Sequence, residues 1–163
     1  MLQPEDYMEM ALAEAHQAEL LNEVPIGAVV VYHGEVIGAG HNMREKFQNA
    51  AYHAEMLAIM EACEHLKSWR LEECDLYVTL EPCMMCSGAI MNSRIRSLYY
   101  GAKNPKAGTV DSLYHLLSDS RLNHQVEIVS GVKETECQQM LKRFFKRVRK
   151  ERKAAKKAAQ QKN

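Results

Sequence analysis

The chain has little that would place it in a membrane or outside the cell. No apolar run among its 163 residues approaches the roughly 20 residues that a membrane-spanning helix needs. The N-terminus begins Leu2-Gln3-Pro4-Glu5-Asp6, an acidic start without the apolar core of a signal peptide. With 47% hydrophobic residues, the chain is neither collagenous nor wholly disordered. These features exclude the corresponding classes and predict a single globular domain in the cytoplasm.

Cysteine is scarce and its count is odd, which argues against a disulfide framework. The chain has 5 cysteines, and in a reducing compartment such thiols serve as core residues, metal ligands or nucleophiles. Cys63, Cys74 and Cys137 fall on predicted apolar faces or at the ends of elements, so we expect core thiols there. Cys83 and Cys86 have a spacing that indicates chemistry.

The net charge is zero, but the basic and acidic residues are unevenly distributed along the chain. The 21 basic residues balance 21 acidic ones, yet the last 22 residues hold 11 Lys or Arg and a single acid, Glu151. This leaves 10 basic and 20 acidic residues among the first 141. A basic C-terminal segment on an acidic body suits a polyanionic partner such as nucleic acid, and it equally suits a solvated helix end.

Hydrophobic periodicity predicts alternating helices and strands. The predicted helices are 4–21, 52–66, 83–92, 109–118 and a long C-terminal helix with Cys137, Met140, Leu141, Phe144, Phe145 and Val148 along its apolar side. The predicted strands are 25–32, 35–39, 76–80, 98–100 and 126–132, of which the first two form a hairpin. Residues 43–51 are expected to be irregular, and Leu57, Met60 and Cys63 share a face of the second helix.

This order of elements predicts the fold class. Helices between strands require crossovers, which place helices on both faces of a largely parallel sheet after an antiparallel opening pair. We therefore expect an α/β protein with a three-layer α/β/α sandwich around a five-stranded mixed sheet. Residues 1–150 form the predicted domain. Residues 151–163 form a basic tail that is expected to fray, because the apolar stripe stops at Val148.

Two short motifs carry the candidate chemistry. They are His53-Ala54-Glu55 and Pro82-Cys83-Met84-Met85-Cys86, and Cys83 follows His53 by 30 residues. Cysteines three apart in the first turn of a helix point the same way, and the free N–H groups of that turn favour thiolates. One imidazole and two thiolates form a three-ligand zinc set with the fourth position open to water, which is typical of a catalytic site.

Glu55 can serve this site only under one local geometry. Residues two apart on a helix are separated by about 200°, so His53 and Glu55 do not share a helical face. They converge on one ion only if His53 occupies the first, half-helical position, which predicts a helix start within two residues of His53. A carboxylate beside a zinc site is placed to take and return protons. A lone Cys-x-x-Cys would also suit a redox pair; the two motifs together favour zinc.

The two motifs match the H-x-E and P-C-x-x-C signature of the zinc-dependent nucleobase deaminases. Further segments make the chain resemble the bacterial tRNA-specific adenosine deaminases from about residue 5 to residue 152. These segments are Val24-Pro25-Ile26-Gly27-Ala28, Gly40-His41-Asn42, Thr79–Ile90, Tyr100-Gly101-Ala102-Lys103, Leu122-Asn123-His124 and Phe144-Phe145.

The resemblance implies an activity and its site. The reaction would be hydrolysis of adenosine to inosine at the wobble position of a tRNA anticodon loop. Zn2+ would be held in each subunit by His53, Cys83 and Cys86, and Glu55 would be the catalytic proton shuttle. The implied substrate-binding residues are Asn42, Ala54, Asn104, Lys106 and Arg149.

Two further expectations follow from the resemblance. The family is dimeric, and apolar Met84 and Met85 beside the metal motif suit an interface, so we expect a homodimer. Asn104 departs from the aspartate that many relatives carry there. The change replaces an acceptor-only carboxylate with an amide that both donates and accepts, which bears on how the nucleotides flanking the target are held.

Two other functions compete with this interpretation. A zinc deaminase of a free base, nucleoside or nucleotide, such as cytidine, deoxycytidylate or guanine, would share the metal motifs. Asn42, Phe144-Phe145 and the basic C-terminal helix favour tRNA over that alternative. A non-catalytic, zinc-stabilised RNA-binding module is the second alternative, and it would need neither Glu55 nor an open metal position.

Overall fold

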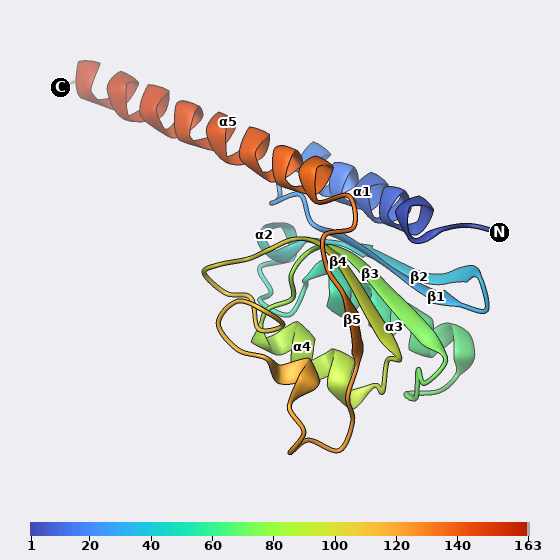
Figure 1. Ribbon diagram of the computed structural model, residues 1–163. Helices are drawn as coiled ribbons and strands as arrows, with labels where there is room; N and C mark the ends of the chain where they lie inside the picture. The colour runs from blue at the N-terminus through green and yellow to red at the C-terminus, as the bar shows by residue number, and fades with distance from the viewer. Residues whose placement is uncertain (163) are drawn as a thin grey trace.

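The computed structural model describes residues 1–162. Figure 1 shows a twisted sheet flanked by helices, with both ends of the chain on the same side of the sheet. The elements are α1 (Pro4–Leu20), β1 (Gly27–Tyr32), β2 (Glu35–His41), α2 (Arg44–Phe47), α3 (Ala54–Leu66), β3 (Cys74–Leu80), α4 (Met84–Asn92), β4 (Ser97–Ala102), the 3₁₀ turn Leu116–Ser118, β5 (Glu127–Val129) and α5 (Glu134–Gln161).

The sheet confirms the predicted fold class. Its strand order is β2-β1-β3-β4-β5; β1 is antiparallel to both of its neighbours, whereas β3, β4 and β5 are parallel. Helices α1 and α5 lie on one face and α3 and α4 on the other (Figure 1). Successive side chains of β1 alternate between the layers: Val29 packs with α1, and Val30 packs on the opposite side with α3.

Helices approach the sheet closely because glycine faces alanine. A Cβ added at Gly38 would lie 2.2 Å from the carbonyl oxygen of Ala58 on α3, and one at Gly27 would lie 2.0 Å from that of Ala11 on α1. The side of α3 facing the sheet is therefore made of small residues, including Ala54 and Ala58. The apolar face expected from Leu57, Met60 and Cys63 is not the buried side of α3, because Met60 is 51% exposed.

Three segments differ from the prediction. Residues 44–47, expected to be irregular, form the short helix α2. Only Leu116–Ser118 is helical in the segment predicted as helix 109–118, and β5 covers three of the seven residues predicted as a strand. The loop before Leu116 is ordered instead by contacts with Glu81, described below.

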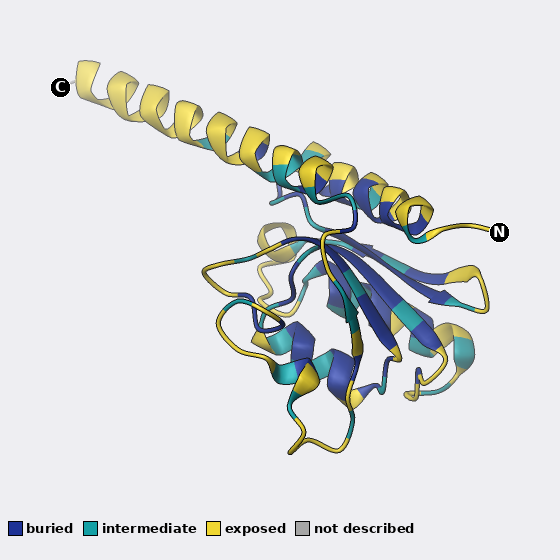
Figure 2. Ribbon diagram, viewed as in Figure 1, coloured by how far each residue is buried: buried dark blue, intermediate teal, exposed yellow. Residues whose placement is uncertain are grey.

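Helix α5 is longer than expected. Its first half packs on the sheet through Cys137, with Met140 and Leu141 against the same cluster. Ion pairs of 2.5 Å (Lys133–Glu9, at the residue before the helix) and 3.0 Å (Arg143–Glu19) join it to α1. The helix then continues to Gln161 with its surface exposed, as the yellow ribbon in Figure 2 shows. Lys, Ala, Gln and Arg are strong helix formers, which explains regular helix where we expected fraying. Asn163 lies outside the described residues.

Among residues 1–162, the helices are all too short or too polar to span a bilayer.

Candidate active site

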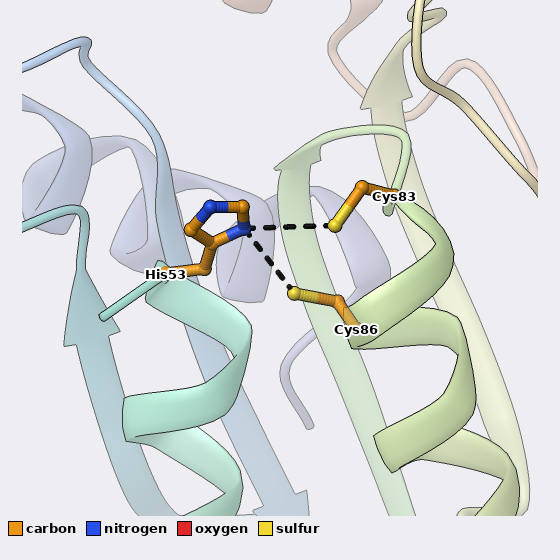
Figure 3. A group of neighbouring side chains, drawn as sticks. All are labelled: His53, Cys83 and Cys86. Carbon is orange, nitrogen blue, oxygen red and sulfur yellow. Dashed lines mark hydrogen bonds between the residues drawn. The ribbon is translucent and has the colours of Figure 1, made fainter. Parts of the chain in front are cut away.

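The metal motifs meet where two helices begin side by side. His53 is the residue before the first turn of α3, with extended backbone, and Cys83 holds the same position before α4. The predicted helix start within two residues of His53 is confirmed. Pro82 ends the segment after β3 and lets α4 start directly. Figure 3 shows the imidazole pointing from α3 toward the two sulfur atoms at the start of α4.

The three donor atoms have the spacing of zinc ligands. His53 Nδ1 lies 3.6 Å from Cys83 Sγ and 3.5 Å from Cys86 Sγ, and all three atoms lie within 4.8 Å of one another. Tetrahedral zinc with its usual bond lengths to nitrogen and sulfur separates such ligand atoms by about 3.6 Å. One nitrogen and two sulfurs are donor atoms that zinc prefers, and their spacing matches that of tetrahedral zinc ligands.

The electrostatics of the triad favour a thiolate at Cys83. A hydrogen bond from Cys86 lowers the pKa of the Cys83 thiol to about 4, helped by His53 and opposed by burial. The same contacts raise the pKa of His53 and, together with burial, raise the pKa of Cys86. Thiolates are the form that binds metal, and a bound cation takes the place of the remaining thiol proton.

Glu55 lies in the first turn of α3, behind the triad. Its side chain is 4% exposed, and burial raises the pKa of the carboxyl group. Its carboxylate interacts with Cys86, and its charge acts on His53. The structure therefore brings all four predicted residues together: three donors for a metal ion and one buried acid next to them.

Comparison with known proteins decides the family. A protein-family model described as MafB19-like deaminase matches residues 2–149. The tRNA-specific adenosine deaminase of Bacillus subtilis (strain 168) is 54% identical over 157 residues, which cover 96% of this chain and 98% of that protein. The chain belongs to the family of tRNA-specific adenosine deaminases. The family member of Streptococcus pyogenes serotype M1 is 49% identical and covers 92% of this chain.

Solved structures of this deaminase superfamily have the same fold. A chain from a study of A-to-I editing by tRNA:A34 deaminases superimposes with a TM-score of 0.80 at 46% identity, covering 83% of this chain and 99% of that one. A guanine deaminase from Bacillus subtilis has a TM-score of 0.60 at 34% identity and covers 63% of this chain and 66% of its own.

In this deaminase the amide of Asn42 is already engaged within the chain. Asn42 is 6% exposed; its Nδ2 donates to the carbonyl of Val24 at 3.3 Å, and its Oδ1 accepts from the N–H of Arg44 at 3.1 Å. The side chain thus fixes the turn between β2 and α2. An amide can make about four hydrogen bonds, so one donor and one acceptor direction remain for a base.

The other predicted substrate-binding residues lie in different places. Ala54 is fully buried in the first turn of α3, between His53 and Glu55. Asn104 and Lys106 lie together in the loop after β4, where Asn104 Oδ1 accepts from the N–H of Ala107 at 3.2 Å. Arg149 lies on α5 at the wall of a separate groove.

That groove runs between α5 and the segment around α2. Its volume is about 530 Å³, and Arg44, Arg149 and Arg152 line it together with Phe144 and Phe145. Phe145 is 42% exposed. The N–H of Met43, next to Arg44, donates to the carbonyl of Tyr52, next to His53, at 3.0 Å, which places this end of the groove near the metal centre. Sequence patterns did not reveal Arg44, because residues 43–51 gave no periodic signal.

Glu81 is the second residue that sequence reasoning missed. It is 1% exposed directly before Pro82 and Cys83, and its carboxylate accepts hydrogen bonds from the loop after β4. A charged residue between a strand and a metal motif is the signal that could have pointed to it, since acids are seldom fully buried without partners.

Proposed function

We propose that this protein catalyses the zinc-dependent hydrolysis of adenosine to inosine at the wobble position of a tRNA anticodon loop. The observation that carries the proposal is the His53–Cys83–Cys86 donor set at zinc spacing next to buried Glu55, in a chain 54% identical to a tRNA-specific adenosine deaminase. When bound, zinc lowers the pKa of water toward about 7, which makes a nucleophile available at neutral pH.

The role of Glu55 follows from its position. Water adds its oxygen to C6 of adenine, the C6–N6 bond breaks, and ammonia leaves, so protons must move from water to the base. The carboxylate of Glu55 accepts one proton from water and delivers it to N1. It then accepts the second proton of that water from the hydroxyl formed at C6 and delivers it to the departing nitrogen. His53, Cys83 and Cys86 hold the ion, and the buried setting keeps competing water away from the carboxylate.

An anticodon loop is a suitable substrate for this site. Its bases are unpaired, so the target base can reach the metal site without the unpairing cost of a duplex. The groove with Arg44, Arg149 and Arg152 offers guanidinium groups to phosphates and exposed aromatic surface to a base. Lys106 and Asn104, in the loop after β4, would provide contacts to neighbouring nucleotides.

Removal of residues 151–163 tests the contribution of the end of α5. The segment carries five Lys or Arg residues, and its described part is exposed, so we expect tRNA affinity to fall about tenfold at 0.1 M salt. Zinc content and the thermal midpoint should not change. Binding measured over a salt series should show a smaller slope for the truncated protein. Equal affinity and equal slope would exclude a role for this segment in RNA binding.

The substrate is tested by mapping inosine. The purified protein is incubated with a tRNA that carries adenosine at the wobble position, and parallel reactions measure ammonia released from cytidine and from guanine. Inosine at that position alone supports the proposal. Ammonia from a free base with no inosine in tRNA would instead assign this chain the activity suggested by its similarity to guanine deaminase.

We also propose that the protein is a cytoplasmic homodimer. All five cysteines are free thiols, which suits a reducing compartment. Exposed apolar side chains gather on α4 and on the loop that follows β4: Met84 is 68% exposed, Leu113 54% and Tyr114 59%. Exposed apolar surface of this kind is typical of protein interfaces.

Met84→Glu tests the dimer. A buried unpaired carboxylate costs several kcal/mol, so we expect the dimer dissociation constant to rise at least about tenfold in sedimentation equilibrium. Met10→Glu, on the exposed side of α1, is the matched control and should leave association unchanged. A monomeric wild-type protein at micromolar concentration would contradict the proposal.

A further inference from the structure

We propose that Glu81 is a positioning residue for the substrate, because its carboxylate holds the loop 104–112 against the turn that carries the metal ligands. The inference rests on the proposed function, since Asn104 and Lys106 in this loop are the expected contacts to RNA. Glu81 is separated from the loop by more than 20 residues and reaches it through side-chain hydrogen bonds alone at both of its oxygens.

Five hydrogen bonds converge on this one carboxylate. Oε2 accepts from three consecutive backbone N–H groups, those of Val110 at 3.1 Å, Asp111 at 2.9 Å and Ser112 at 3.0 Å. Oε1 accepts from the N–H of Asn104 at 3.1 Å and from the hydroxyl of Ser112 at 2.5 Å. Oε2 therefore bonds only the end of the loop, whereas Oε1 bonds both its beginning, at Asn104, and its end, at the Ser112 hydroxyl.

Only an ionised carboxylate suits this position. All five partners donate, and an ionised carboxylate accepts at both oxygens. The fit is tight, since a Cβ at Gly108 would lie 2.4 Å from Glu81 Cδ. A neutral side chain at position 81, or any side chain at position 108, would displace the loop.

Apart from the Glu81 carboxylate, the two ends of the loop are anchored differently. Near the C-terminal end, the N–H of Thr109 donates to the carbonyl of Pro82 at 2.9 Å, and its hydroxyl donates to Ser87 Oγ on α4 at 2.8 Å. These bonds do not depend on Glu81. The backbone N–H of Asn104, at the other end, donates to Glu81 Oε1. The backbone is held as far as Ala102, whose carbonyl accepts from the N–H of Glu81 at 2.8 Å. Beyond Ala102, the bond from the Asn104 N–H to Glu81 Oε1 ties the beginning of the loop to the segment before the metal ligands.

Glu81→Gln separates the two ends. With the amide oxygen at the Oε2 position, the three N–H groups of residues 110–112 keep an acceptor. The amide NH₂ then occupies the Oε1 position, where it faces the N–H of Asn104, and the hydroxyl of Ser112 can turn to accept from it. Only Asn104 is left opposite another donor. The variant should release the beginning of the loop and retain its end.

The experiment uses the zinc-loaded protein and tRNA with adenosine at the wobble position. We expect Glu81→Gln to speed hydrogen exchange of the Asn104 amide at least about tenfold, with smaller changes at residues 110–112. KM for tRNA should rise about tenfold, while kcat stays within about twofold and zinc content is unchanged. Asp75→Asn is the control: Asp75 lies on β3, the strand that ends directly before Glu81, and it pairs with Arg96. It should leave KM and Asn104 exchange unchanged.

The outcomes separate this inference from the proposed function. Unchanged exchange at Asn104, or a fall in kcat at constant KM, would overturn the positioning role. If Glu81→Gln does not fold or loses zinc, Ser112→Ala decides, because it removes one bond from the same oxygen: a raised KM supports the role and an unchanged KM overturns it. A wild-type protein that forms no inosine would contradict the proposed function. Hydrogen exchange at Asn104 would then still report on the loop.

Discussion

Glu55→Gln is expected to lower kcat for tRNA deamination by about 10³-fold or more, while the protein keeps its fold and its zinc. General acid–base catalysis by one group contributes roughly 10²–10⁴-fold, and Glu55 is proposed to handle protons at two stages of the reaction. Glutamine has nearly the same shape and cannot take up a proton at neutral pH. The substitution therefore removes the chemistry and leaves the packing of α3.

Three measurements together make this result specific. Single-turnover rates with saturating tRNA report the chemical step, metal analysis reports zinc, and equilibrium binding reports tRNA affinity. We expect only the first to change. Glu61→Gln, an exposed carboxylate on the same helix, is the matched control and should have wild-type rates. A Glu55→Gln protein with more than about a tenth of the wild-type rate would rule out the proton-shuttle role.

The position of Glu55 relative to His53 could be predicted from the local sequence alone. The H-x-E spacing requires His53 to stand at the edge of a helix if both side chains face one ion, and α3 begins at Ala54 as that argument demands. The constraint is local, because it involves only the rotation between neighbouring helical positions. The hairpin of β1 and β2 was predictable for the same reason, since the β-branched run, the His33-Gly34 turn and the returning segment are adjacent in the chain.

The errors arise where packing between distant segments decides the structure. On α3 the large residues Leu57 and Met60 suggested the buried face, but the sheet beneath carries Gly38, so the alanine side faces it at close range. The size of the sheet residues that face α3 cannot be read from the sequence of the helix itself. Periodicity of large apolar residues therefore predicted that α3 exists and missed which side is buried.

Glu81 explains a second error. Residues 109–118 contain apolar residues at helical spacing, yet the N–H groups of Val110, Asp111 and Ser112 donate to a carboxylate about 30 residues earlier in the chain. Side-chain acceptors compete with helical hydrogen bonds, and here the competing acceptor is the residue that follows β3. The α5 tail shows the opposite case: without tertiary contacts to override it, propensity alone sustains the helix to Gln161.

Cys86→Ala is expected to abolish both zinc binding and activity. Structural zinc sites have binding free energies of roughly 10–16 kcal/mol at pH 7, so loss of one of three protein ligands should weaken affinity by at least about three orders of magnitude. Cys86 is fully buried, and its sulfur lies 3.5 Å from His53 Nδ1, so the variant leaves two donors that cannot complete the set. Metal analysis after dialysis should find the protein essentially free of zinc.

Cys74→Ala is the control that separates ligation from packing. Cys74 is also fully buried, but it does not belong to the group of donor atoms that His53, Cys83 and Cys86 form. It packs in the core with Leu71 and Leu76 instead. Cys74→Ala should therefore lower the thermal midpoint by a few degrees and keep zinc and activity. Full zinc occupancy in Cys86→Ala would contradict the ligand assignment, and zinc loss in both variants would trace the effect to the core rather than to the donor set.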